Sequence, residues 1–278
     1  MNLFSRALAL NRFLIIAHRG LWGGNVIQNT RQAAQLGKRA GADIIEIDIS
    51  RSSDGVYYLF HDAAGPYLLQ DKIVLGDLTS SEIRELEYYN ARQSLSGYKI
   101  EKLSDFLDWL PLNILVNINL AWKYFDDPAL YEIIETSGKR DQIYFKSSPK
   151  DDHLKYFEEM SRGMHYVPII FEQADIQRCH ADYPDLNILG YEFIVKDENT
   201  DLWEPGFLEK LGGEQKLLIA NSEYVAKDFI IYNNWNDDTA LFNQEEDTWG
   251  KTLGTGINTI MTDWPYFLND YRKNIHLM

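Results

Sequence analysis

Eight short apolar runs, mostly separated by segments of helical character, constrain the fold of this chain more than any other feature of its sequence. They are residues 13–17, 44–49, 112–118, 142–147, 166–171, 187–195, 217–220 and 257–261. Strands that are apolar along nearly their whole length are typical of parallel sheets buried on both faces. Eight of them in 278 residues predict a closed (β/α)8 barrel, the TIM barrel, which typically takes about 250 residues.

The interval between the second and third runs is too long for a single helix. It begins with Asp54-Gly55, a hairpin signal, followed by an apolar stretch at 56–60, so we expect the chain to double back antiparallel to the second strand. This turn would return His61 close to the carboxyl end of that strand. We expect residues 63–76 to form a small insertion at the barrel mouth.

The whole chain, residues 1–278, is expected to form one domain, because Pro and Gly are scattered and no linker is apparent. A second irregular segment, 221–238, lies between the seventh strand and its helix and contains Tyr224, Tyr232 and Trp235. Two interpretations of it stay open. It is either a lid over the barrel mouth or an irregular loop packed on the rim.

The charge of the chain limits its partners. It has 27 basic and 42 acidic residues, a net charge of -15, which would repel nucleic acid and anionic membranes and would suit a cation. The single cysteine, Cys179, cannot form an internal disulfide and is expected to be a free core thiol. No run reaches the roughly 18 uncharged apolar residues of a membrane span, and no secretory signal is recognisable. We therefore expect a cytoplasmic protein without stable membrane insertion, of unknown oligomeric state.

The first apolar run stops abruptly at His18-Arg19-Gly20. A buried strand that ends this way delivers a ring that can move a proton near neutral pH and a planar donor fork suited to an oxyanion. If this motif is considered alone, the alternative to a functional role is that His18 is a purely structural residue.

The second run contains Glu46-Ile47-Asp48, which places two carboxylates on the same side of a strand. Two inward-facing carboxylates would repel each other unless a cation or strong donors compensate, and oxygen ligands suit Mg²⁺ or Ca²⁺. An outward, solvated pair is the alternative, but the isoleucines of this run leave little of it looking solvent-facing.

In their order and spacing these motifs resemble the glycerophosphodiester phosphodiesterase family, whose barrel is of the phosphatidylinositol-specific phospholipase C-like type. The resemblance rests on His18-Arg19-Gly20, Asn29-Thr30, Glu46-Ile47-Asp48, Asp54-Gly55, His61-Asp62 and Thr262-Asp263-Trp264-Pro265. It covers nearly the whole chain. It implies a barrel with a small insertion after the second strand, in agreement with the apolar pattern.

The resemblance implies metal-dependent hydrolysis of a glycerophosphodiester or a similar small phosphodiester to an alcohol and a phosphomonoester. It implies that His18 and His61 act as general acid and general base, one taking a proton from the nucleophile and the other giving one to the leaving oxygen. Arg19 would bind the phosphoryl oxygens. Glu46 and Asp48 would hold the divalent cation, Ca²⁺ or Mg²⁺.

The chain departs from the family's pattern at three positions. Asn117 and Asn119 stand where a Glu-x-Lys motif normally supplies a third metal carboxylate and a lysine, and Gln28 replaces a glutamate. Asn117 can still offer its amide oxygen to the metal, although less strongly than a carboxylate. Lys123 is a displaced substitute for the lysine, and the loop at Trp22 is expected to line the substrate site.

These losses of charge keep two other interpretations open. A catalytically weakened relative would bind a phosphate ester without ordinary turnover, because removing one electrostatic stabiliser can reduce a rate by about 10²–10³. A barrel lyase or isomerase would instead use Glu46, Asp48 and a metal on a substrate that is not a phosphate.

Overall fold

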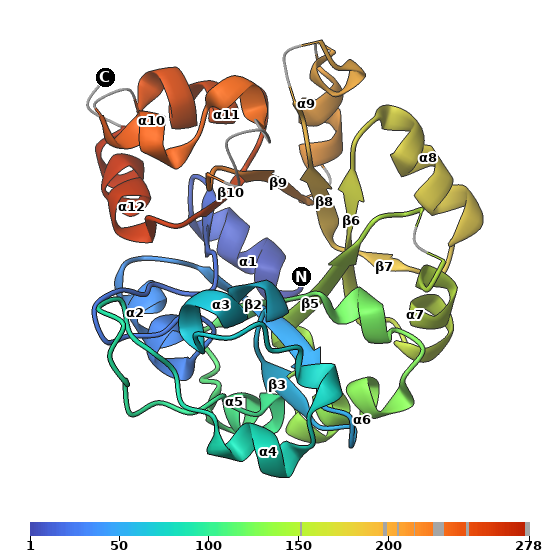
Figure 1. The fold of residues 1–278 in the computed structure, drawn as a ribbon. Coiled ribbons are helices and arrows are strands. Elements are labelled where there is room, and N and C mark those ends of the chain that lie inside the picture. The colour runs from blue at the N-terminus through green and yellow to red at the C-terminus, as the bar shows by residue number, and fades with distance from the viewer. Residues whose placement is uncertain are drawn as a thin grey trace.

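The computed structural model describes residues 1–150, 152–196, 199–204, 206–213, 215–224, 231–242 and 245–275. Its centre is a closed barrel of parallel strands (Figure 1), which confirms the predicted (β/α)8 fold. The barrel strands are β1 (Leu14–Ala17), β2 (Ile44–Arg51), β4 (Leu115–Asn119), β5 (Ile143–Ser147), β6 (His165–Ile170), β8 (Gly190–Phe193), β9 (Leu217–Asn221) and β10 (Thr259–Thr262), with β7 (Asn187–Ile188) also on β6. Each overlaps one predicted apolar run, and β1 closes the barrel by pairing with both β2 and β10.

Helices and short turns surround the barrel (Figure 1). The α-helices are α1 (Leu3–Leu10), α2 (Arg31–Arg39), α3 (Gly65–Leu68), α4 (Ser80–Glu85), α5 (Leu103–Trp109), α6 (Pro128–Ser137), α7 (Leu154–Met160), α8 (Gln173–Asp182), α9 (Phe207–Gly212), α10 (Asp237–Leu241), α11 (Lys251–Gly254) and α12 (Pro265–Asn274). The 3-10 turns are η1 (Asp62–Ala64), η2 (Leu75–Asp77), η3 (Ala121–Tyr124), η4 (Arg140–Gln142), η5 (Asp201–Trp203) and η6 (Tyr232–Asn234), and η7 (Glu246–Gly250) is a π-helical turn.

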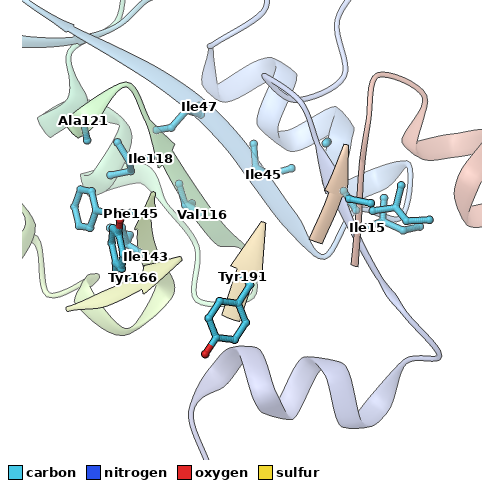
Figure 2. Close-up of a cluster of buried hydrophobic side chains, with 14 of the residues drawn as sticks. Ile15, Ile45, Ile47, Val116, Ile118, Ala121, Ile143, Phe145, Tyr166 and Tyr191 are labelled. Carbon is cyan, nitrogen blue, oxygen red and sulfur yellow. The ribbon is translucent and has the colours of Figure 1, made fainter. Parts of the chain in front are cut away.

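Both faces of the barrel strands are buried, which explains their continuous apolar sequences. On β2, Ile45 and Ile47 belong to the cluster that the strands form with the surrounding helices (Figure 2). The alternate residues face the barrel interior, where Ile16 and Ile44 belong to a second cluster. Because successive strand residues point to opposite faces, this register also turns Glu46 and Asp48 into the barrel.

Helix α1 closes the amino-terminal end of the barrel. Its Phe4 is fully buried in the interior cluster, together with Ile16 and Ile44. The ring of Phe4 meets that of Tyr144 on β5 edge to face, with centroids 5.5 Å apart. This apolar plug leaves the opposite, carboxyl end for the inward-facing polar side chains, which is the end where TIM-barrel active sites lie.

The chain doubles back after β2, as the hairpin signal predicts. Strand β3 (Tyr57–Leu59) pairs antiparallel with the end of β2, and Gly55, with φ +90°, donates its N–H to the carbonyl of Ser52 (3.0 Å) in the turn. The segments that follow, up to the start of α5, pack around a small apolar cluster of their own. Its buried members are Ile27, Tyr58, Phe60, Leu69, Leu75, Ile83, Tyr88 and Ile100. The expected insertion, 63–76, is one part of this larger unit.

The second irregular segment, 221–238, is described only at its flanks, since residues 225–230 lie outside the described part. Tyr232 is buried and donates its hydroxyl to the carbonyl of Phe193. Trp235 stacks on Trp203, with ring centroids 5.4 Å apart and planes 10° apart. This flank packs on the end of β8 at the barrel rim.

The composition led to two further expectations, one about the single cysteine and one about membrane-spanning helices. Cys179 on α8 is a buried free thiol, and burial raises its pKa to about 12. Within the part of the chain that the structure describes, no helix combines the length and the apolar character needed to cross a bilayer.

Candidate active site

His18 lies directly after β1, at the carboxyl end of the barrel. Its N–H donates to the carbonyl of Thr262 (3.1 Å), and its Nδ1 lies 2.8 Å from Oδ1 of Asp263, so the end of β10 orients the ring. Burial lowers the pKa of His18, but the hydrogen bond to Asp263 and the charges of Glu46 and Glu223 outweigh it and raise the pKa to about 9. The contact engages Nδ1 and leaves Nε2 to exchange a proton. The motif that contains Asp263 does not by itself predict that Asp263 contacts His18, because that contact depends on the pairing of β1 with β10.

A strained turn follows His18. Arg19 has φ 55° and Gly20 has φ 79°, a region that favours glycine. A Cβ on Gly20 would lie 2.5 Å from the carbonyl carbon of Ala33 in α2, so no larger residue fits without moving the helix. The turn directs the side chain of Arg19 into the barrel mouth.

Arg19 contacts both predicted carboxylates. Its backbone N–H donates to Oε2 of Glu46 (3.0 Å), and its Nε lies 2.9 Å from Oδ2 of Asp48. Its Nη1 donates to Oε1 of Gln28 (2.7 Å). The guanidinium is therefore held by one full negative charge and one neutral amide.

Glu46 and Asp48 are both fully buried. Burial and the charge of Asp48 raise the pKa of Glu46, although the charges of His18 and Lys146 act in the opposite direction. Asn29 supports Asp48 twice, because its amide donates to Oδ2 (3.2 Å) and its carbonyl oxygen accepts the N–H of Asp48 (2.9 Å). Asn29 of the Asn29-Thr30 motif therefore holds Asp48, while Thr30 caps α2 by accepting the N–H of Ala33.

Asn117 and Asn119 of β4 lie opposite Glu46 and Asp48 in the strand register. Asn119 donates its Nδ2 to Oδ1 of Asp48 (3.1 Å). Among the residues that the structure describes, no donor reaches the buried Oδ1 of Asn117 or the buried Oε1 of Glu46. Unpartnered buried oxygens on two paired residues fit the oxygen ligand set of a hard divalent cation.

A cation at this point would be held by two carboxylates and one amide. In the described ranges of the chain, no group of three His, Cys, Asp or Glu side chains is arranged to hold a metal ion. Glu46, Asp48 and Asn117 would form a mixed set instead, with one negative charge fewer than three carboxylates would bring. We expect such a set to bind a cation less tightly.

The hairpin returns His61 to the end of β2. The N–H of Phe60 donates to the carbonyl of Asp48 (3.1 Å), and Nδ1 of His61 accepts from the N–H of Ala63 (3.1 Å). Burial lowers the pKa of His61 more than the charge of Asp48 raises it. Like the ring of His18, this ring is held through Nδ1.

Arg19 and His61 line one pocket of about 400 Å³. Trp22, half-exposed, lines it too. Lys123 on η3 is not among the described residues that line it, and its Nζ lies 5.9 Å from the ring centroid of Trp122. The charge of Lys123 still reaches the site, since it contributes to the lowered pKa of His61.

Sequence reasoning missed a buried ion pair in the barrel interior. Nζ of Lys146 on β5 lies 2.8 Å and 3.1 Å from the two carboxylate oxygens of Glu192 on β8, and Asn221 of β9 donates to the same carboxylate (3.2 Å). Burial lowers the pKa of Lys146, but the charges of Glu192 and Glu46 outweigh it and raise the pKa above its ordinary value. A lone charge inside an otherwise apolar predicted strand is the signal that could have identified both residues.

Two other buried acids belong to this end of the barrel. Glu223 and Asp237 are 7% and 1% exposed, and burial raises the pKa of each to about 7. Asp237 accepts hydrogen bonds from Oγ1 of Thr262 (2.8 Å) and from the N–H of Asp263 (2.9 Å). It thereby fixes the segment that orients His18.

The chain belongs to the glycerophosphoryl diester phosphodiesterase family, whose model matches residues 18–173. The match contains His18, His61, both buried carboxylates and Asn117, and it ends before β8. This membership agrees with the resemblance inferred from the sequence motifs.

Two curated relatives are similar to part of the chain. The Bacillus subtilis protein YqiK is 33% identical over 111 residues, 38% of this chain and 44% of its own length. The Arabidopsis thaliana glycerophosphodiester phosphodiesterase GDPD4 is 36% identical over 99 residues, 34% of this chain and 29% of its own length. The chain therefore spans less than half the length of either relative in these matches.

Solved structures share the fold across nearly the whole chain. A glycerophosphoryl diester phosphodiesterase from Parabacteroides distasonis has a TM-score of 0.70 at 12% identity and covers 99% of this chain and 92% of its own. An Oleispira antarctica phosphodiesterase, in complex with the product sn-glycerol-3-phosphate, has a TM-score of 0.66 at 16% identity, covering 92% and 95%. At these identities the likeness establishes the fold.

Proposed function

We propose that the protein is a metal-dependent phosphodiesterase that hydrolyses glycerophosphodiesters or similar small phosphodiesters to an alcohol and a phosphomonoester. The observation that carries the proposal is the position of Arg19, which contacts both buried carboxylates and lines one pocket with His61. Family membership supports the class of reaction. The product bound in the Oleispira antarctica neighbour supports a small substrate for a barrel of this kind.

His18 and His61 are the proposed general acid and base. Each ring is held through Nδ1, by Asp263 and by the N–H of Ala63, so each can offer Nε2 to the substrate. One histidine takes a proton from the attacking water while the other gives one to the leaving oxygen. Arg19 binds the phosphoryl oxygens through the donors of its guanidinium, and Trp22 and Lys123 are the proposed contacts to the rest of the substrate.

Glu46, Asp48 and Asn117 are the proposed ligands of a divalent cation, Ca²⁺ or Mg²⁺. When bound, such an ion polarises the phosphate and neutralises part of its charge. The chain itself adds positive charge in the same place, because Arg19 pairs with Asp48 and the charge of Lys146 acts on Glu46.

Choline release from glycerophosphocholine tests the proposal. We expect turnover with Ca²⁺ or Mg²⁺, loss of turnover in excess chelator, and a decrease of about 10²–10⁴-fold in His61→Ala, which removes one proton-transfer group. His180→Ala is the matched control, since His180 lies on α8, contacts the hydroxyl of Tyr191 on β8 and is not among the described residues that line the pocket. Equal rates for the wild type and His61→Ala would refute the proposed role.

A second candidate function, a phosphate-ester-binding relative without ordinary turnover, is favoured by the amides on β4. Asn119 donates to Asp48, where a lysine would bring charge, and Asn117 offers a neutral oxygen in place of a third carboxylate. Under this alternative, wild-type turnover is near zero and the double variant Asn117→Glu, Asn119→Lys raises it. Rapid wild-type turnover rules the alternative out.

We also propose that residues 1–278 act as one phosphodiesterase-like domain, with the unit around 63–76 over the mouth. The support is that strands of the barrel and helices from α2 to α12 contribute to one continuous buried cluster. The segment 221–238 is proposed to border the mouth, because its described flank packs against β8.

A further inference from the structure

We propose that the pocket beside Arg19 and His61 binds an apolar substituent of the phosphodiester, so that the protein prefers diesters carrying a hydrocarbon chain. This inference rests on the proposed function and names the substrate class of the same site. The pocket measures about 400 Å³, which lies in the range of about 300–1,000 Å³ typical of small-molecule sites.

The walls of the pocket are apolar and aromatic beyond the two reaction groups. The larger apolar and aromatic side chains of the lining are Trp22, Val26, Ile27, Tyr67, Leu68 and Tyr89. The other polar members of the described lining are the uncharged Gln28, Asn90 and Gln93. A pocket with this lining stabilises a hydrocarbon group by removing it from water.

The charge of the lining makes a neutral chain a better occupant than a cationic headgroup. Arg19 is its only fixed charge among the described residues, and no carboxylate belongs to it. A quaternary ammonium group would find aromatic faces but would lie beside a guanidinium. A neutral chain meets no such repulsion, whereas the phosphate to which it is attached is attracted to Arg19.

Hydrogen bonds between its two walls hold the pocket open. The loop after β1 is tied to the segment before α5, because Ala91 donates its N–H to the carbonyl of Gly24 (3.1 Å) and Asn90 donates to Asn25 (2.9 Å). On the other side, the N–H of Tyr89 donates to the carbonyl of Leu68 (2.7 Å). A preformed pocket spares the ligand the cost of ordering its walls.

Exposure of the aromatic side chains also points to a ligand. Trp22 is 46% exposed and Tyr67 is 72% exposed, and both belong to the pocket that contains Arg19 and His61. Exposed apolar surface gathered in a concave site beside reaction groups is typical of ligand-binding grooves. Arg19, the proposed phosphate-binding residue, lines the same pocket as these aromatic side chains. A substituent attached to the bound phosphate would therefore occupy the apolar part of the pocket.

Calorimetric titration with two phosphodiesters of equal charge tests the inference. Dimethyl phosphate and hexyl methyl phosphate differ by five methylenes, and each fully buried methylene increases affinity by roughly fourfold. We expect wild-type protein to bind the hexyl compound at least about thirtyfold more tightly. Equal affinities would overturn the inference.

Two variants and one control keep the test specific to the pocket. Ala91→Trp fills the pocket and should reduce the chain-length gain to less than about threefold, and Tyr67→Ser, at a highly exposed side chain, should reduce it by about threefold. Ala181→Trp, an exposed position on α8, should keep the full gain. An undiminished gain in both pocket variants would contradict the proposal.

Glycerophosphocholine hydrolysis separates this inference from the proposed function. A chain-length gain without hydrolysis would support the apolar site and refute the reaction. Hydrolysis without a chain-length gain would support the reaction and refute the apolar site.

Discussion

Buried charge is concentrated at the carboxyl end of the barrel. Glu46, Asp48, Lys146 and Glu192 are each at most 3% exposed. An unpaired charge at such depth costs several kcal/mol. Lys146 therefore pairs with Glu192, and Asp48 pairs with Arg19. For Glu46, burial and the charge of Asp48 raise the pKa.

Removing one member of the Lys146–Glu192 pair should be more harmful than removing both. Lys146→Met leaves a buried carboxylate without its partner and should lower the free energy of unfolding by about 3–5 kcal/mol. The double variant Lys146→Met, Glu192→Leu should recover most of that loss, because apolar replacements of a whole buried pair are often neutral. Chemical denaturation measures both, and a double variant less stable than the single one would contradict the account.

The pKa of His18 should depend on Asp263. In metal-free protein, Asp263→Asn keeps a hydrogen-bond acceptor but removes the charge, so the pKa measured by NMR titration should fall from about 9. Because the folded pKa lies above the ordinary value of 6.5, the stabilisation by this pair is complete below pH 6.5 and is lost as the pH rises through about 9. The variant should flatten that decline, and an unchanged pKa would show that Asp263 does not hold the proton.

Individual site residues could be predicted only where they belong to a motif. His18, Arg19 and the carboxylates of β2 stand at strand ends or alternate along one strand, which the sequence displays directly. Lys146 and Glu192 lie 46 residues apart, and their pairing depends on barrel closure. The local sequence pattern around each residue therefore could not predict that Lys146 and Glu192 form an ion pair.

At the scale of elements, the turn from β1 to α2 sets the geometry of the mouth. It follows His18, directs Arg19 inward and passes Ala33 so closely that a Cβ on Gly20 would lie 2.5 Å from its backbone. Gly24, later in the same loop, also has positive φ (+60°), but no atom of the described residues beyond its chain neighbours lies within 4 Å of a Cβ placed there. A comparison of substitutions at these two glycines therefore distinguishes the energetic cost of a steric clash from that of backbone strain.

Gly20→Ala should destabilise the protein more than Gly24→Ala. The second variant has only the strain of a left-handed residue, about 1–2 kcal/mol, whereas the first adds overlap with the backbone of α2 and should lose about 3 kcal/mol or more. Thermal unfolding of the two variants measures the difference. Equal losses would show that the close approach to Ala33 is relieved without energetic penalty.

The elements themselves were largely predictable. The apolar runs identify every barrel strand because parallel strands are buried on both faces, and Asp54-Gly55 predicts the hairpin by its turn chemistry. The full extent of the unit around 63–76 was not predictable. Its cluster joins Ile27 to Tyr88 and Ile100, contacts that no local pattern reveals.

At the scale of the whole molecule, the barrel has an apolar end and a polar end. Helix α1 closes the first, where Phe4 packs on Tyr144 and His165, with ring centroids 5.5 Å and 5.7 Å apart. The sequence did not predict this plug, because a short helix before the first strand can pack in several places.

Phe4→Ala should test the plug. Deleting a fully buried phenylalanine should lower the free energy of unfolding by about 3–5 kcal/mol, while Leu10→Ala on the same helix, at a side chain 76% exposed, should change it by about 0.5 kcal/mol or less. Urea denaturation compares the two. Similar small effects would mean that α1 contributes little to the barrel core.

The polar end is the proposed centre of phosphodiester hydrolysis, and one measurement tests that claim most directly. Phosphorus NMR of glycerophosphocholine with Ca²⁺ or Mg²⁺ follows the diester and the monoester in the same sample, for the wild type and for His18→Ala side by side. The account predicts that the wild type converts diester to monoester and that the variant is slower by about 10²-fold or more. No monoester with the wild type, or equal rates in the two proteins, would contradict it.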